Sequence, residues 1–232
     1  LKKLLDGPNK KQYEGLISKV FGEDVLPIRS AKDVANMMQI KEGEKFTRYL
    51  DILLLPKLIL TNREVHAEAA YDLAKHFFTE FNVGHFRLKF TLSRQSGMEN
   101  EQIPGISQLT PEDVVLGLYD GFKKYQKEEP RFKFTLSPSF RKEEGFFDSK
   151  RFKSKEEDFL YQVNSLLEML EKYPQLKPVL TDVDTVGNET GLYRKSHFAT
   201  MQKGFQKLHL YGFKIRSHHG EVWETLNRGI QA

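Results

Sequence analysis

The chain has 232 residues, of which 39% are hydrophobic and 29% charged, and a formal net charge of +4. These values are ordinary for a globular protein, and no apolar run approaches the roughly 20 residues of a membrane span. Cysteine is absent, which excludes disulfides, thiolate zinc sites and cysteine nucleophiles within this chain. Basic and acidic residues are interleaved, which favours solvated helix faces over a nucleic-acid surface. We therefore expect a cytoplasmic protein that binds neither nucleic acid nor membrane.

Residues 1–80 are predicted to form short helices joined by loops. Pro8 and Pro27 break the first part into short pieces. Thr61 is predicted to cap a long helix, because Glu64 follows three residues later and completes a capping box. The residues at helical spacing that should form the buried face of this helix are Val65, Ala69, Leu73 and Phe77.

From residue 85 onward, the pattern alternates between strands and helices. Strands are predicted over residues 85–93, 132–139, 178–186 and 212–217, with helices over residues 110–127, 154–173 and 198–208. Thr110 and Pro111 are typical of a helix start, with a capping residue followed by proline at the first helical position. Strands that alternate with helices in this way indicate βαβ units and a parallel sheet. The glycine patterns of dinucleotide and P-loop sites are absent after these strands.

Polar and titratable residues follow several of the predicted strands. Asp184 and Gly187 end the third strand, and His218 and Glu221 follow the fourth. Parallel strands that each contribute chemistry to one edge are typical of a (β/α)8 barrel. A histidine and an acid at that edge suit a metal-assisted hydrolase. Taken alone, Asp184 and Gly187 also fit a hydrogen-bonded strand acid and a turn residue.

The motifs at these two strand ends are similar to those of a known protein family. Asp184-Thr-Val-Gly187-Asn-Glu189, followed about 30 residues later by Ser217-His218-His219-Gly220-Glu221, resembles the adenosine/AMP deaminase family. That family belongs to the metal-dependent amidohydrolase superfamily and has a (β/α)8 TIM barrel. The resemblance implies that residues 1–232 form a single partial barrel domain with about strands two to five. Residues 1–80 would be a helical segment covering the barrel mouth, and residues 81–232 would be successive βα units.

The resemblance also implies roles for individual residues. His218 would be a ligand of one zinc ion, and Glu221 would protonate the purine ring at N1 while water adds at C6. Gly187 would donate its backbone N–H to the purine, with Asp184 beside the substrate. Phe46 and Leu50 would form an apolar wall, although a role in the core of a helix fits them equally well. The implied partner is a small-molecule purine nucleoside, converted to its oxo product and ammonia.

The chain also departs from the family pattern. The family carries a His-x-His pair on its first strand and a further histidine and an Asp-Asp pair on later strands, none of which occurs here. One histidine cannot hold a catalytic zinc ion, which needs about three protein ligands. The chain therefore resembles the middle of a barrel and is not expected to be a competent deaminase alone.

Some questions of substrate and function stay open at this point. His219 replaces the usual alanine, and Lys89 and Thr91 stand where the family often has an acid and an arginine. AMP, adenine or a modified nucleoside remain alternative substrates, and a non-catalytic barrel that binds a purine or a protein is an alternative function. The histidines expected at surface or core-edge positions rather than as ligands are His66, His76, His85, His197 and His209.

Overall fold

The computed structural model describes residues 1, 5–44, 48, 52–92, 109–149, 151–187 and 196–218. Phe46, Leu50 and Glu221, three of the residues predicted to form the site, lie outside these ranges. The elements in chain order are α2 (Lys10–Phe21), η1 (Glu23–Val25), α3 (Ala31–Met37), α5 (Leu54–Ile59), α6 (Arg63–Phe81), β1 (His85–Thr91), α7 (Pro111–Glu128), β2 (Lys133–Arg141), α8 (Lys155–Lys172), η3 (Pro174–Leu176), β3 (Asp182–Val186), α9 (His197–Tyr211) and β4 (Lys214–Ile215). None of the helices within the described ranges is long and apolar enough to cross a membrane.

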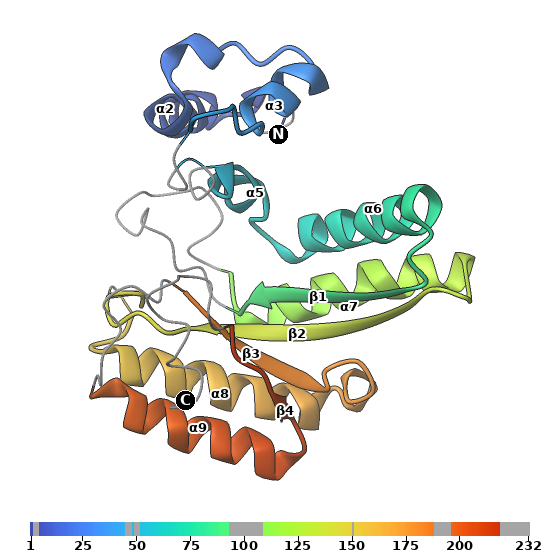
Figure 1. The fold of residues 1–232 in the computed structure, drawn as a ribbon, viewed down its shortest axis with the longest axis vertical. Helices are drawn as coiled ribbons and strands as arrows, with labels where there is room; N and C mark the ends of the chain where they lie inside the picture. Colours follow the sequence, from blue (N-terminus) through green and yellow to red (C-terminus); the bar gives the residue numbers. More distant parts are fainter. Residues whose placement is uncertain are drawn as a thin grey trace.

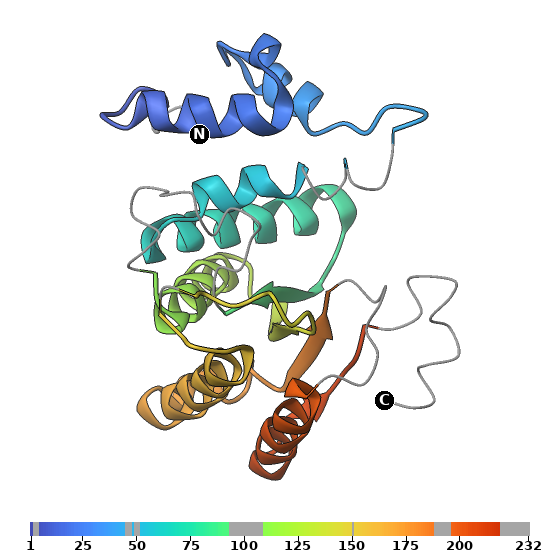
Figure 2. The ribbon, with the colours of Figure 1, turned by 90° about the vertical axis from the view of Figure 1, so that its left-hand side faces the viewer.

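The four strands form a mixed α/β architecture around one parallel sheet, in the order β1-β2-β3-β4. A helix lies between each pair of successive strands in the chain, and Figures 1 and 2 show α6 to α9 on one side of the sheet. The prediction of a parallel sheet built from βα units is therefore confirmed. Because all four strands run in the same direction, their carboxyl ends lie at one edge, where the predicted site residues follow β3 and β4.

The sheet face under the helices is apolar. Residues of β2 on that face, including Leu136 and Phe140, are buried against α7, α8 and α9. Phe122 of α7 is fully buried, and its ring lies 6.1 Å from that of Phe132 and 5.2 Å from that of Phe134. This aromatic cluster joins the sheet to α7, and burial of such large rings is a dominant source of core stability.

The helix boundaries predicted for α7 and α8 are largely confirmed. Thr110 caps α7 in a capping box with Asp113, and Ser154 caps α8 by accepting a bond from the backbone of Glu157. Both caps satisfy backbone N–H groups that have no partner within the helix. Apolar residues at helical spacing in the sequence also predict one buried face for α8. This is confirmed, and the buried residues are Phe159, Val163, Leu166, Leu167 and Leu170.

The prediction for α6 was wrong in its cap and partly wrong in its buried face, because Val65, Leu73 and Phe77 are only half-buried. Asn62, not Thr61, caps the helix, since its side chain accepts a 2.9 Å hydrogen bond from the backbone of Val65. The buried residues are His66, Ala70 and Ala74, whereas Ala69 is exposed.

The partner helix explains which face of α6 is buried. Gly117 and Gly121 of α7 lie so close to the backbone of α6 that an added Cβ would collide with the carbonyl oxygens of Arg63 and Ala67. This close approach selects the side of α6 that carries small residues. Periodicity within α6 alone does not contain that information.

The N-terminal helices have a small hydrophobic core of their own. Its fully buried members include Tyr13, Ile17, Leu55 and Leu58. Figures 1 and 2 show α2 and α3 beyond α5 and α6, away from the sheet. The prediction of a helical N-terminal part is confirmed over its described residues, while its proposed covering of a barrel mouth stays a prediction.

Candidate functional site

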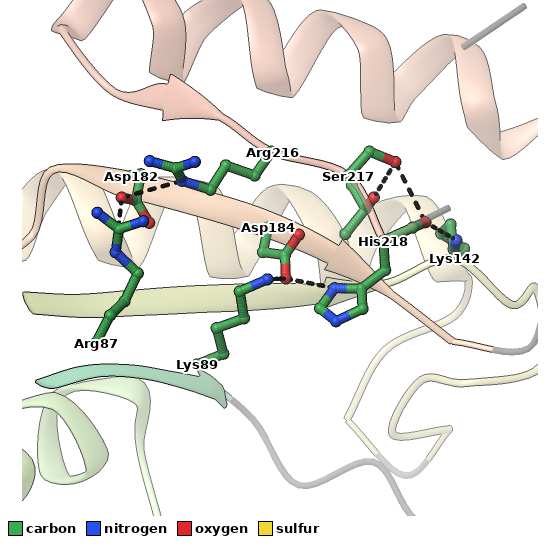
Figure 3. Close-up of polar contacts among 9 residues, drawn as sticks. Arg87, Lys89, Lys142, Asp182, Asp184, Arg216, Ser217 and His218 are labelled. Atoms are coloured by element: carbon green, nitrogen blue, oxygen red, sulfur yellow. Dashed lines mark hydrogen bonds and ion pairs between the residues drawn. The ribbon is translucent and has the colours of Figure 1, made fainter. Parts of the chain in front are cut away.

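The face of the sheet opposite the helices is polar and charged. Successive side chains of a strand point to opposite faces, so residues two apart in sequence share a face. Alternate residues on this face are Arg87 and Lys89 of β1, Ser137 and Ser139 of β2, Asp182 and Asp184 of β3, and Arg216 and His218 after β4. The strands therefore collect cations and carboxylates on one surface (Figure 3).

Asp184 joins residues of two other strands in what we call the outer triad: Lys89, Asp184 and His218. Its Oδ2 atom lies 2.9 Å from Nζ of Lys89 and 2.6 Å from Nδ1 of His218 (Figure 3). The Asp184 side chain is fully buried, whereas 41% of the Lys89 side chain and 31% of the His218 side chain is exposed. The carboxylate thus orients an imidazole that is still partly accessible.

The inner triad repeats this arrangement two residues earlier on each strand and consists of Arg87, Asp182 and Arg216. Oδ2 of Asp182 lies 3.5 Å from Nε of Arg87 and 3.3 Å from Nε of Arg216. Asp182 is also buried, and both of its partners are partly exposed. The two triads differ in chemistry. An arginine stays charged and cannot ligate a metal ion, whereas a histidine can exchange a proton or ligate a metal ion.

Small side chains on β2 make the outer triad possible. Lys89 pairs in register with Ser137, and Asp184 with Ser139, so the Lys89 side chain must cross β2 to reach Asp184. Both serines are buried, and neither hydroxyl group forms a hydrogen bond within the part of the chain that the structure describes. A bulky residue at these positions would occupy the path of the lysine.

The backbone on both sides of His218 is held by hydrogen bonds. Its N–H donates to the carbonyl of Thr185 at 3.0 Å, and its carbonyl accepts from Nζ of Lys142 at 2.7 Å (Figure 3). The hydroxyl of Thr185 also donates to that of Ser217 at 3.0 Å. The pairing with β3 therefore continues beyond the two residues of β4 and fixes the position of His218.

Gly187 ends β3 in a conformation that favours glycine, with φ of +120°. The carboxylate of Glu143 occupies the space that a Cβ at this position would need. Glu143 is bound in turn by Arg141, with its oxygens 2.7 Å and 3.1 Å from the guanidinium. The guanidinium lies 4.1 Å from the ring centroid of Phe146. A side chain at position 187 would therefore displace an ordered ion pair at the strand end.

The predicted site residues have different outcomes. His218, Asp184 and Gly187 lie at the same edge of the sheet, and His218 and Asp184 are in direct contact. That contact was not foreseen, and neither was the inner triad. The sequence does contain titratable residues two apart on β1, on β3 and after β4, but only the order of the strands in space shows which of them meet. The proposed roles of all six residues stay predictions.

The described ranges contain no group of three histidine, aspartate or glutamate side chains placed to bind one metal ion. Within those ranges, Nε2 of His218 has no hydrogen bond or ion pair, since Asp184 engages only Nδ1. Nδ1 of His218 thus lies at ion-pair distance from a buried carboxylate, without a hydrogen bond between them, and Nε2 faces no described partner.

No protein-family model matches this sequence, and no curated protein matches it. Solved structures do match. They include ADAL in complex with IMP (16% identity, TM-score 0.58), a Zn-bound amidohydrolase from Burkholderia ambifaria (13%, 0.57) and adenine deaminase from Arthrobacter aurescens (12%, 0.53). The described α/β fold is therefore similar to part of the fold of these amidohydrolases.

The matches to these amidohydrolases cover nearly all of this chain but only part of theirs. They span 95%, 94% and 90% of this chain and 57%, 52% and 54% of the ADAL, Burkholderia and Arthrobacter chains. The chain therefore spans about half the length of the amidohydrolases it matches. At such low identity the likeness shows the fold alone, and it does not assign a substrate.

Proposed function

We propose that this chain forms about strands two to five of a (β/α)8 barrel whose full-length protein is a zinc-dependent deaminase of 6-aminopurine nucleosides. The parallel sheet and its helices support the barrel, as do the matches to amidohydrolases over about half of their length. In this proposal residues 81–232 are consecutive βα units of one domain, and residues 1–80 lie over its mouth. The matched structures include an adenine deaminase and a complex with IMP, which supports a purine as the class of ligand.

The observation that carries the proposal is the contact between Asp184 and His218. A histidine that ligates a metal almost always donates its other ring N–H to a carboxylate, carbonyl or water, which fixes the ring and its tautomer. Nδ1 of His218 lies 2.6 Å from the buried Asp184 carboxylate, so that Nε2 is the nitrogen for zinc. The residues therefore fit a zinc ligand and its supporting carboxylate, and further ligands must come from outside the described residues.

A bound zinc ion would supply a water molecule with its pKa lowered to about 7. The residues of this chain would bind the ion, orient the substrate and donate a proton. His218 would hold the ion, and Asp184 would orient His218 while lying close to the substrate. Gly187 would donate its backbone N–H to the purine, and Glu221 would give a proton to N1. Phe46 and Leu50 would provide an apolar wall against the base.

Zinc content and adenosine turnover of the full-length gene product test this function. We expect one zinc ion per chain and a change in ultraviolet absorbance as adenosine is deaminated. AMP, adenine and N6-methyladenosine in the same assay would distinguish the alternative substrates. A wild-type protein that binds purine but neither holds zinc nor turns over any of these compounds would contradict the proposal in favour of a binding-only barrel.

Two substitutions separate the roles within the site. His218→Ala should lose zinc and activity together. Glu221→Gln should keep zinc while kcat falls by about 10²- to 10⁴-fold, the usual contribution of a general acid. Full activity of His218→Ala would contradict its role as a zinc ligand. Near-normal turnover of Glu221→Gln would contradict its role as the general acid.

A further inference from the structure

Lys142, the residue after β2, connects three strand ends and a helix through separate groups. Its backbone N–H donates to the carbonyl of Val186 at the end of β3, at 2.8 Å. Its carbonyl accepts from Nε2 of the buried His197 at the start of α9, at 2.8 Å. Its side chain reaches past β3, where Nζ donates to the carbonyl of His218 at 2.7 Å (Figure 3).

Within the described residues, the bond to His218 lies next to the last backbone hydrogen bond between the β3 segment and the chain after β4. Backbone bonds between the β3 segment and the chain after β4 run from Arg216 to Val183 and from His218 to Thr185. The carbonyl of His218 accepts from the Lys142 ammonium at 2.7 Å and from the hydroxyl of Ser217 at 3.4 Å, and from no backbone donor within the described part of β3. A charged donor makes a hydrogen bond roughly twice as strong as a neutral one, so the Lys142 ammonium adds a strong contact to the His218 backbone.

We propose that Lys142 is a positioning residue that holds His218 in the orientation needed to bind zinc. This inference rests on the proposed function of His218. Asp184 fixes the imidazole ring from one side, and Lys142 fixes the backbone that carries the ring from the other. Lys142 also transmits the position of α9 to the site, because His197 holds the same residue through its carbonyl.

The expected size of the effect follows from what is already known of residues that support metal ligands. Substitution of such residues typically costs about 10- to 100-fold in metal affinity. Lys142 acts on the backbone of the ligand and Asp184 still holds the ring, so we expect about a tenfold loss, at the lower end of that range.

Lys133 provides a matched control on the same strand. Its Nζ also donates to a backbone carbonyl, that of Pro130 at 3.1 Å, but at the opposite end of β2. Lys142→Met and Lys133→Met each keep the apolar stem and remove one ammonium. Lys142→Arg restores a charged donor at the site and serves as the rescue variant.

The experiment measures two quantities on the full-length protein: Zn²⁺ affinity by competition with a chelator, and hydrogen exchange of the backbone amide of His218. We expect Lys142→Met to bind Zn²⁺ about tenfold more weakly and to exchange the His218 amide faster. Lys133→Met should match the wild type in both, and Lys142→Arg should recover most of the affinity. Equal affinity and exchange in Lys142→Met and the wild type would overturn the inference, as would an equal loss in Lys133→Met.

The two readouts also keep this inference distinct from the proposed function. If the wild-type protein binds no Zn²⁺, the proposed function fails and the role of Lys142 in zinc binding fails with it. If the wild type binds Zn²⁺ and Lys142→Met binds it equally well, only the inference about Lys142 fails. Faster exchange of the His218 amide with unchanged Zn²⁺ affinity would show a structural bond without the positioning role, and would also contradict the inference.

Discussion

The two faces of the parallel sheet are built from opposite kinds of side chain. The face under α6 to α9 buries aromatic and aliphatic residues such as Phe134, Leu136 and Phe140. The other face carries the two triads, in which buried carboxylates meet partly exposed lysine, arginine and histidine side chains. Apolar burial stabilises the fold in proportion to area, whereas an ion pair with a buried carboxylate gains little net stability because the cost of desolvation offsets the attraction. The helix-covered face therefore maintains the fold, and the polar face is free to serve chemistry.

The largest effect is expected on the helix-covered face. Phe122→Ala removes a fully buried ring that packs on Phe132 and Phe134. It should lower the free energy of unfolding by about 3–5 kcal/mol, measured by urea denaturation. Zinc affinity of the protein that remains folded should stay at the wild-type value. A Phe122→Ala protein that is stable but binds zinc poorly would show that the two faces are not separable.

On the polar face, we expect a change in ligand binding rather than in the fold. Asp184→Asn removes the charge that orients His218 and should weaken zinc binding by about 10- to 100-fold. Asp182→Asn makes the same chemical change in the inner triad, which contains two arginines instead of a lysine and a histidine. It should leave zinc affinity close to wild type. Equal losses in the two variants, determined by chelator competition, would mean that the triads do not differ in function.

A smaller effect on stability is expected at Ser137, where the side chain of Lys89 crosses β2. Ser137→Leu should force the lysine away from Asp184 and overpack the buried position, with a cost in stability of about 1–3 kcal/mol. Ser137→Ala is the control, because the Ser137 hydroxyl has no hydrogen bond within the described part of the chain. We expect it to stay within about 0.5 kcal/mol of wild type. Thermal or urea unfolding of both variants measures this difference. Equal stability of Ser137→Leu and Ser137→Ala would contradict a lysine path across β2 that a bulky residue blocks.

The smallest effect concerns pH and the buried histidine between α6 and α7. Burial lowers the pKa of His66 below its ordinary value of 6.5, although its Nδ1 donates to the carbonyl of Asn62. Below about pH 6.5 the unfolded chain therefore binds a proton that the folded chain does not, so stability falls as the pH falls through that range. His66→Gln should reduce this slope in urea unfolding between pH 5 and 8. His76→Gln, on the exposed side of the same helix, controls for the loss of a histidine, and an unchanged slope in His66→Gln would contradict the assignment.

Local signals in the sequence were sufficient for much of the fold. The cap at Thr110 and the apolar stripe of α8 depend on residues close together in the chain, and both were predicted. The face of α6 was not, because Gly117 and Gly121 on another helix decide which side of it is buried. For the same reason the sequence indicated Asp184 and His218 as separate candidates, while their contact depends on the register of β3 with the chain after β4. Contacts between segments far apart in the chain therefore determine features that the local periodicity of one segment does not contain.

The most direct test of the account is the position of zinc in a crystal of the full-length protein. An anomalous difference map at the zinc edge should show a peak about 2.0–2.1 Å from Nε2 of His218, the usual distance for a histidine ligand. Nδ1 should remain on Asp184, as it is in this structure. A zinc-replete, active protein whose peak lies away from His218 would contradict the central claim.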